Sequence, residues 1–185
     1  MFGGLRIMNK KIRGFEVVKS YKSEQINLPR RSTHHSAGYD IEAAQTITIP
    51  SYWELVFKYL LKKLLKKQVF DDVDAQDLWR SSLVPTGLKA YMQNDEYLQI
   101  INRSSNPLKR FLSLPNSVGV IDADYYNNSN NEGHIYVQLI NYGIKDVTIN
   151  KGDRIAQGIF TKYLKVDDDQ GGLKQRQGGF GSSDN

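Results

Sequence analysis

The strongest constraint in the sequence is a series of short segments rich in β-branched and aromatic residues, separated by Asn, Gly, Pro and Ser. Several segments alternate apolar and polar residues with a period of two, as half-buried strands do. Many brief strands without intervening helices predict an all-β body of the barrel or jelly-roll kind. A chain of 185 residues can bury a real core, and we expect a single domain over residues 1–185. The strands are expected at Gly14–Ser20, Gln45–Pro50, Ser82–Ala90, Glu96–Ile101, Val118–Asp122, His134–Asn141, Asp146–Ile149 and Arg154–Phe160.

One segment, residues 52–80, breaks the strand pattern. From Tyr52 to about Phe70 the chain has neither Gly nor Pro, and apolar residues recur at helical spacing with lysines between them. An aspartate then offers a cap for a second, acidic helix that runs to Trp79. The pattern predicts a helical hairpin inserted between two strands, with its basic and acidic helices paired.

Cysteine is absent from the sequence, which excludes disulfides, zinc–thiolate sites and cysteine nucleophiles. The histidines, His34, His35 and His134, are too few and too scattered for a metal cage. Any metal is therefore expected to be a hard, oxygen-binding ion such as Mg²⁺. No apolar run approaches the roughly eighteen residues that span a bilayer, and the N-terminus lacks a signal-peptide segment. We expect a cytoplasmic protein without a membrane partner.

The net charge of +5 comes from the N-terminal part of the chain. Residues 1–31 contain eight basic and two acidic residues, an excess that covers the whole surplus. Such a basic face either attracts nucleic acid or is simply solvated. Because its basic residues are not interleaved with aromatics, we favour the solvated face and expect no nucleic-acid partner.

The C-terminal segment, residues 167–185, is polar and Gly-rich, with almost nothing to bury. It predicts a flexible C-terminal arm, which in most proteins has no further role. Arg176, Phe180 and a serine pair nevertheless lie within it. An arginine and glycine amides can wrap a phosphate chain when one is bound.

Five short stretches follow one another in an order that carries more information than any one of them alone. They are Ser36-Ala-Gly-Tyr-Asp-Ile41, Asn102-Arg-Ser-Ser105, Asn116-Ser-Val-Gly-Val-Ile-Asp-Ala-Asp-Tyr125, Lys151-Gly-Asp-Arg-Ile-Ala-Gln157 and Gly178-Gly-Phe-Gly-Ser-Ser183. Together they resemble the five motifs of the trimeric dUTPase family, and the resemblance runs from about Leu28 to Ser183. It implies a dUTPase-like β-barrel or jelly-roll subunit, in a homotrimer with shared active sites. The implied activity is that of a dUTP diphosphatase, which hydrolyses dUTP to dUMP and pyrophosphate with Mg²⁺ on the triphosphate.

The resemblance places the catalytic residue at Asp122. Hydrolysis at an α-phosphate requires a water that is made nucleophilic and held in line with the leaving pyrophosphate. Asp122 matches the family's catalytic aspartate and is expected to act as the general base. The plain alternative for Asp122 and Asp124 is that both are turn-forming acids at a hairpin entrance. With the whole stretch matched, we favour the base for Asp122 and the turn for Asp124.

The same stretch is expected to bind the nucleoside. Asn116 matches the asparagine that reads uracil, and its amide offers both a donor and an acceptor to the imide edge. A turn asparagine next to Pro115 is the alternative. Gly119 belongs to the same nucleoside-binding set. Tyr125 matches the aromatic residue that packs against deoxyribose and so excludes a 2′-hydroxyl, although it also suits an ordinary strand position.

Two further motifs are expected to bind phosphates. Arg103, Ser104 and Ser105 resemble the second motif, whose serine and backbone amides hold the α- and β-phosphates. Many relatives have glycine where Ser105 stands, but a serine still presents its amide. Gln157 resembles the glutamine of the fourth motif, which contacts phosphate oxygens. Arg154 either does likewise or forms a structural ion pair.

Asp40 is the expected metal residue. It resembles the acid that holds Mg²⁺ through water while the triphosphate supplies the direct ligands, which suits an ion that sheds water reluctantly. A buried aspartate in a turn that leads into a strand is the alternative. Asp40 and Asp153 are also the two acids that Arg154 would pair with in a structural role.

The arm completes the implied site. Phe180 resembles the aromatic residue that stacks over uracil when the arm closes. Arg176 would then meet the γ-phosphate, with Gly181, Ser182 and Ser183 close to it. Arg176 stands one residue nearer to the phenylalanine than the corresponding arginine of many relatives. Closure predicts an arm that becomes ordered when nucleotide binds.

Two segments depart from the compact members of the family. The loop 126–133 is longer than the turn of many relatives, and the insertion 52–80 is absent from them. Neither interrupts a motif. Either one is a tolerated surface insertion, which we favour, or a surface for a regulatory protein partner.

Two other functions remain as hypotheses. A dCTP deaminase shares the architecture, but Ile121-Asp-Ala-Asp-Tyr125 and the Gly-rich arm favour the hydrolase. A regulatory binding protein would use the insertion to engage a partner and the nucleotide as its signal. A compact chain with short insertions suits a bacterium or its phage, and the residues before Met8 need not belong to the natural protein.

Overall fold

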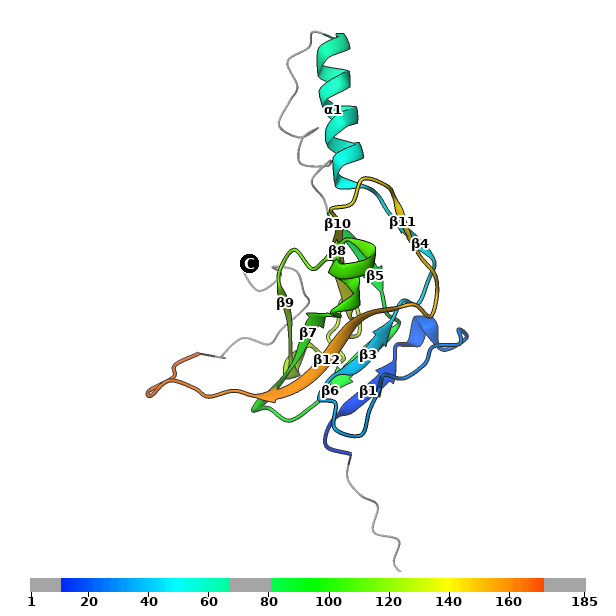
Figure 1. Ribbon diagram of the computed structural model, residues 1–185. Helices are drawn as coiled ribbons and strands as arrows, with labels where there is room; N and C mark the ends of the chain where they lie inside the picture. The colour runs from blue at the N-terminus through cyan, green and yellow to red at the C-terminus, as the bar shows by residue number, and fades with distance from the viewer. Residues whose placement is uncertain (1–10, 67–80, 172–185) are drawn as a thin grey trace, which may run out of the picture.

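The computed structural model describes residues 11–66 and 81–171 (Figure 1). Within them lie twelve strands, all paired antiparallel, and one long helix. The strands are β1 (Gly14–Val17), β2 (Arg30–Arg31), β3 (Tyr39–Glu42), β4 (Ile47–Ile49), β5 (Ser82–Pro85), β6 (Leu88–Tyr91), β7 (Glu96–Asn102), β8 (Leu112–Ser113), β9 (Val118–Asp122), β10 (Tyr136–Asn141), β11 (Val147–Ile149) and β12 (Arg154–Lys162). The all-β class predicted from the sequence is confirmed.

Four small sheets make up the body. The largest has the order β2-β3-β12-β7-β9, and the others have the orders β5-β10-β8, β1-β6 and β11-β4. Neighbours in the sheets are mostly distant in sequence, as in a jelly roll. The long strand β12 pairs with β3 on one side and with β7 on the other. The five-stranded sheet therefore collects four of the sequence motifs, on β3, after β7, on β9 and on β12.

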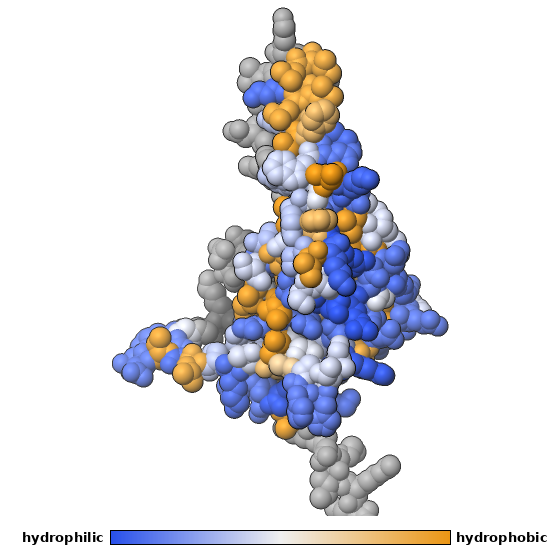
Figure 2. Space-filling model, viewed as in Figure 1, coloured by the Kyte–Doolittle hydropathy of each residue, from blue (hydrophilic) through white to orange (hydrophobic). Residues whose placement is uncertain are grey.

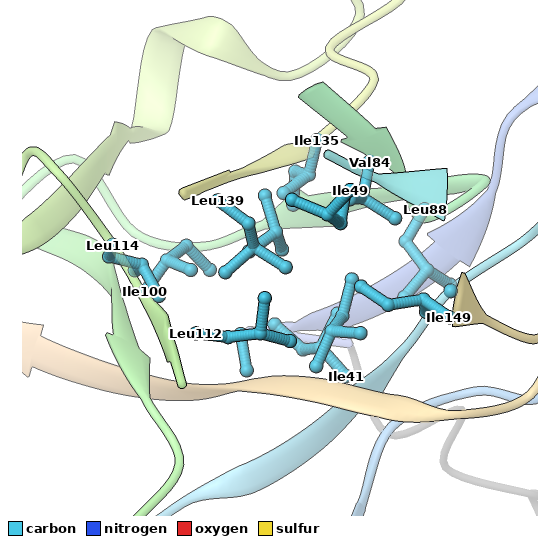
Figure 3. Packing of buried hydrophobic residues seen from close by; sticks show 14 of the residues in the cluster. Ile41, Ile49, Val84, Leu88, Ile100, Leu112, Leu114, Ile135, Leu139 and Ile149 are labelled. Atoms are coloured by element: carbon cyan, nitrogen blue, oxygen red, sulfur yellow. The ribbon is translucent and has the colours of Figure 1, made fainter. Parts of the chain in front are cut away.

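The core lies between the sheets (Figure 3). The side chains of a strand point alternately to its two faces, and one face lies on the core. Every second residue is buried along β10, and the same holds along most of β7. Each fully buried Leu or Ile stabilises the fold by roughly 1.5–3 kcal/mol. The largest buried side chains include Ile41, Ile49, Val84, Leu88, Leu98, Leu112, Ile135, Leu139 and Ile149.

The predicted strand Ser82–Ala90 is wrong as a single strand, because Thr86 and Gly87 separate β5 from β6. Gly87 has a φ of +69°, which favours glycine. Its amide donates to Nε2 of the buried His134 over 2.9 Å, so a side chain rather than a neighbouring strand satisfies it. The short strands β2, β3 and β8 were not expected from the alternation.

The predicted first helix is present as α1 (Tyr52–Lys66). Ser51 caps it, since its hydroxyl accepts from the amide of Glu54 over 3.1 Å and donates to the carbonyl of Gly143. The helix projects from the β body and carries exposed apolar side chains (Figures 1 and 2). In the part of the chain that the structure describes, no helix is long and apolar enough to cross a membrane. The second predicted helix lies outside the described residues.

Candidate active site

Asp40 on β3 is the centre of a polar cluster, named here the Asp40 cluster, that four segments contribute. Its carboxylate is buried, with 7% of the residue exposed. Arg103 donates from Nε to Oδ1 over 3.1 Å, and Arg154 donates from Nη1 to Oδ2 over 3.1 Å. Gln157 donates to Oδ1 over 3.3 Å, and the hydroxyl of Ser32 donates to Oδ2. Strand pairing thus joins residues of three motifs in one cluster.

The carboxylate of Asp40 is held in its charged form. Burial alone would raise the pKa of Asp40, but the hydrogen bonds and the two arginine charges outweigh it and lower the pKa below its usual value. Of the two acids considered as partners for Arg154, Asp40 is the one that pairs with it. Asp153 instead pairs with Arg110.

The second motif forms the turn that follows β7. Ser104 is exposed and Ser105 is half-buried, directly after Arg103 in the chain. The side chain of Asn106, 1% exposed, holds this turn against β12 by donating to the carbonyl of Ile155 over 2.7 Å. The turn is therefore held against β12 by Asn106, and Ser104 is exposed on it.

A second feature is a pocket of about 190 Å³ beside β9, named here the Tyr125 pocket. Pockets for whole ligands usually enclose 300–1,000 Å³, so this one suits a part of a ligand, such as a base with its sugar. Its walls are Ile100, Leu114, Asn116, Gly119, Val120, Ile121, Tyr125, Ile135, Tyr136 and Gln138. All three nucleoside-binding residues predicted from the third motif line it.

Gly119 gives the pocket its depth. A Cβ atom there would stand 3.1 Å from Cβ of Ile100, a tighter contact than most side chains make. The amide nitrogen of Asn116 lies 3.8 Å from the same point. A larger residue at 119 would therefore press on both the floor of the pocket and the amide of Asn116.

The ring of Tyr125 is fixed in the pocket wall. The residue is 4% exposed, and its hydroxyl donates to the carbonyl of His134 over 3.0 Å. The amide of Asn131 donates to the same hydroxyl over 2.7 Å. Burial and two hydrogen bonds leave the ring one position.

Asp122 is the last residue of β9, the strand whose Gly119, Val120 and Ile121 line this pocket. It is half-buried, it follows Ile121, and the single helical turn Ala123–Tyr125 begins directly after it. Its neighbour Asp124 is exposed within that turn. Asp122 is therefore less exposed than Asp124.

The Asp40 cluster and Asp122 lie far apart within one chain. One row across the five-stranded sheet consists of Asp40, Gln157, Ile101 and Val118. At about 4.8 Å per strand, β3 and β9 are separated by roughly 14 Å along this row. Asp122 lies four residues further along β9, so its backbone is roughly 20 Å from that of Asp40 by strand geometry.

Two residues of these sites were missed by the sequence reasoning. Ser32 lies outside the first motif, and only the pairing of β2 with β3 brings it to Asp40. Asn131 lies in the Asn-rich loop, which gave no signal beyond its length. The predicted arm residues Arg176, Phe180, Gly181, Ser182 and Ser183 lie outside the described residues.

Comparison with known proteins gives a consistent result. A dUTPase family model matches residues 71–184. The chain is 48% identical over 174 residues to the deoxyuridine 5′-triphosphate nucleotidohydrolase of Lactococcus lactis, covering 94% of this chain and 98% of the relative. It is 35% identical over 149 residues to the enzyme of the same name from Rickettsia typhi, covering 80% of each.

Among solved structures, dUTPase from Streptococcus mutans superimposes with a TM-score of 0.66 at 42% identity, over 83% of this chain and 98% of that one. The dUTPase of Staphylococcus aureus phage φ11 shares the fold, with a TM-score of 0.60 at 17% identity over 86% of this chain. The fold and these relatives thus define a jelly-roll enzyme of nucleotide metabolism. The chain belongs to the dUTPase family, whose members hydrolyse deoxyuridine 5′-triphosphate. The family and enzyme class predicted from the motifs are confirmed.

Proposed function

We propose that the chain splits dUTP into dUMP and pyrophosphate by in-line attack of a water that Asp122 activates. The proposal is supported by the place of Asp122 in the chain, directly after Ile121 and three residues before Tyr125, both of which line the Tyr125 pocket. A nucleoside seated in the pocket would present its α-phosphate on the side of this carboxylate. General-base catalysis of this kind contributes roughly 10²–10⁴-fold to a rate.

The pocket residues divide the recognition of the nucleoside between them. Asn116 would pair with the imide edge of uracil, whose donor and acceptor pattern cytosine reverses in part. Tyr125 would press its ring against deoxyribose and leave no room for a 2′-hydroxyl. Gly119 allows the base to enter, and Phe180 on the arm would stack over it.

The Asp40 cluster and its turn would hold the triphosphate. Arg103 and Gln157 already point donors at an anion, and Ser104 and Ser105 add a hydroxyl and amides beside them. Arg154 is half exposed and paired with Asp40, so it can turn from that carboxylate to a phosphate. On the arm, Arg176, Gly181, Ser182 and Ser183 would close over the γ-phosphate.

Mg²⁺ fits this arrangement as a companion of the substrate. Within residues 11–66 and 81–171 no three His, Cys, Asp or Glu side chains gather as a metal cage. Mg²⁺ normally keeps several waters and binds through substrate phosphates and one or two carboxylates. Asp40, whose oxygens already accept four hydrogen bonds, would hold such an ion through water, and the ion would neutralise the phosphate charge.

We further propose that each active site is shared between chains of a homotrimer. A base and a metal-holding acid that serve one triphosphate cannot work from backbones roughly 20 Å apart in the same chain. The separation is removed if the Tyr125 pocket of one chain faces the Asp40 cluster of another. Closed threefold symmetry would make three such sites alike.

Substitution of Asp122 tests the chemistry. Asp122→Asn keeps the size of the side chain and removes the base, so pyrophosphate release from dUTP with Mg²⁺ should fall by about 10³-fold. Asp124→Asn is the matched control and should retain activity within a few-fold. Release from dCTP, dTTP and UTP should be far slower than from dUTP in the unaltered chain. Equal losses in the two Asn variants would remove Asp122 from the mechanism.

Mixing of inactive variants tests the sharing. Asp122→Asn and Arg103→Gln chains, unfolded together and reassembled, should regain activity, because some sites then combine an intact pocket with an intact cluster. Asp122→Asn mixed with Asn116→Ala should not, because both changes fall on the same side of every site. Recovery in neither mixture would mean that each chain builds its own site.

A second role concerns α1. Its Phe57, Leu64 and Leu65 are exposed. Apolar side chains gather on the helix where it projects from the body (Figure 2), which supports contact with a regulatory protein partner. The structure of the phage φ11 enzyme is described as showing a species-specific insert, and phage 80α dUTPases as controlling transfer of virulence genes. Replacing residues 54–79 by a short Gly-Ser linker should leave dUTP hydrolysis unchanged and abolish binding of such a partner. A loss of hydrolysis instead would assign the insertion to the catalytic body.

A further inference from the structure

The loop 126–133, which the catalytic proposal does not use, is built around the backbone and hydroxyl of Tyr125. Asn128 is 8% exposed, and its amide donates to the carbonyl of Tyr125 and to Oδ1 of Asn131, each over 2.8 Å. Its own Oδ1 accepts from the amides of Asn130 and Asn131. The asparagines therefore form an ordered network, although their sequence is typical of a loose surface loop.

Asn131 is the member of this network that reaches the ring. Its Nδ2 donates to the hydroxyl of Tyr125 over 2.7 Å, while its Oδ1 accepts from Asn128 and from the amide of Gly133 over 3.1 Å. Gly133 has a φ of +81°, and a Cβ atom there would stand 2.6 Å from the carbonyl oxygen of Tyr125. Both ends of Tyr125 are thus held by the same few residues.

A buried cation anchors the loop to the rest of the body. Lys89 on β6 is 6% exposed, and its Nζ lies 2.6 Å from both Oδ1 of Asn127 and Oε1 of Glu132. The other oxygen of Glu132 accepts from the amide of Lys19 over 2.9 Å. These contacts hold the loop at Asn127 and at Glu132, on either side of Asn131. Asn131 is therefore a rigid support and not a side chain that follows the ring.

We infer that Asn131 is a positioning residue that sets the selectivity of the site for deoxyribose over ribose, acting through the hydroxyl of Tyr125. The inference rests on the proposed function, in which the ring of Tyr125 excludes a 2′-hydroxyl. A ring that can tilt leaves room for that hydroxyl, so the support of the ring determines how strongly UTP is rejected. The size of the pocket alone does not fix the ring at its outer end.

The test compares kcat/KM for dUTP with kcat/KM for UTP, a ratio that the fraction of folded enzyme does not alter. Asn131→Ala should lower the ratio roughly five- to tenfold, the effect of losing one partly buried hydrogen bond. Asn131→Asp keeps the shape and the acceptor oxygen but loses the donor, so it should lower the ratio in the same direction. Asn130→Ala, an exposed neighbour with the same chemical change, should leave the ratio unchanged.

A double-substitution cycle shows whether the effect passes through the hydroxyl. In a Tyr125→Phe background, Asn131→Ala should change the ratio no further. An unchanged ratio in both Asn131 variants, or an equal drop in the Phe background, would overturn the inference. Tyr125→Leu separates this from the proposed function: if it leaves the ratio unchanged, the sugar role of Tyr125 itself is wrong. If Tyr125→Leu lowers the ratio and the Asn131 variants do not, only the inference about Asn131 fails.

Discussion

The Tyr125 pocket and the Asp40 cluster are organised by different forces. In the pocket, neutral hydrogen bonds and burial fix Tyr125. In the cluster, Arg103 and Arg154 are held by the charge of Asp40. The pocket is therefore organised by neutral groups, whereas the cluster depends on ion pairs. Under the proposed function, nucleoside selection would use groups already fixed within one chain, and phosphate binding would require the two arginines to exchange Asp40 for a phosphate.

The two regions also differ in solvent exposure. Tyr125 and His134 are almost completely buried, whereas the side chain of Arg154 is 52% exposed and that of Arg103 is 24% exposed. Exposed ion pairs are weak and easily rearranged, and buried neutral networks are rigid. Under the proposed function, a rigid pocket would discriminate the base, and an adaptable ion-pair cluster would bind the phosphates and release pyrophosphate as product.

Of the changes that separate the two regions, protonation of His134, beside the Tyr125 pocket, should have the largest effect on the free energy of unfolding. Burial lowers the pKa of His134 from 6.5 to about 4, with partial opposition from Glu132, and Nε2 must stay unprotonated to accept from Gly87. The unfolded chain therefore binds more protons than the folded one between pH 6.5 and 4. Stability should fall by about 3 kcal/mol as the pH drops through this window and lose no more from this group below it.

His134→Gln provides the comparison for that experiment, since an amide oxygen can still accept from Gly87 but does not titrate. Urea unfolding at a fixed protein concentration should show a steeper loss of stability from pH 6.5 to 4 in the unaltered chain than in the variant. Parallel curves would mean that the folded protein tolerates a charged His134 and that the pocket region is not held by neutral hydrogen bonds alone.

Removal of the charge at Asp40 should have the next largest effect. Asp40→Asn leaves Arg103 and Arg154 facing each other without a carboxylate, and we expect a loss of about 2 kcal/mol, less than for a fully buried pair because both arginines are partly exposed. Glu42→Gln, on the same strand and bonded only to Asn27 in the described chain, should cost less than half as much. Equal costs would show that the cluster does not depend on the charge of Asp40.

Much of the β body could be predicted from local patterns in the sequence. The alternation in β10 and the 3.6-residue period of α1 are set by which face of each element is buried, so a sequence shows them directly. The strand β3 was missed because four residues that include a buried aspartate do not alternate as a half-buried strand does. Their pairing with β12 makes them a strand, and that pairing is non-local.

The candidate site shows the same limit. Motifs identified Arg103, Gln157 and Asp40 one by one, but only the order β3-β12-β7 brings them into contact. The choice of Arg154 between two acids was open for the same reason, and Arg110, from a segment without a motif, decided it by taking Asp153. Asn131 was missed because asparagines in a loop give the same signal whether they hold a ring or only water.

The smallest expected effect on stability is that of Ser32. Its substitution tests whether Ser32 stabilises the protein through the carboxylate of Asp40. Ser32→Ala removes one hydrogen bond to a charged carboxylate at an exposed residue, so urea unfolding at neutral pH should show a loss of about 1 kcal/mol. In the Asp40→Asn background the same change should cost almost nothing, because the charged acceptor is gone. Ser36→Ala, which alters only bonds to Thr33, should cost the same in both backgrounds. If Ser32→Ala costs the same in the two backgrounds, the hydroxyl supports the loop before β3 and not the carboxylate. The cluster would then consist of Asp40, its two arginines and Gln157.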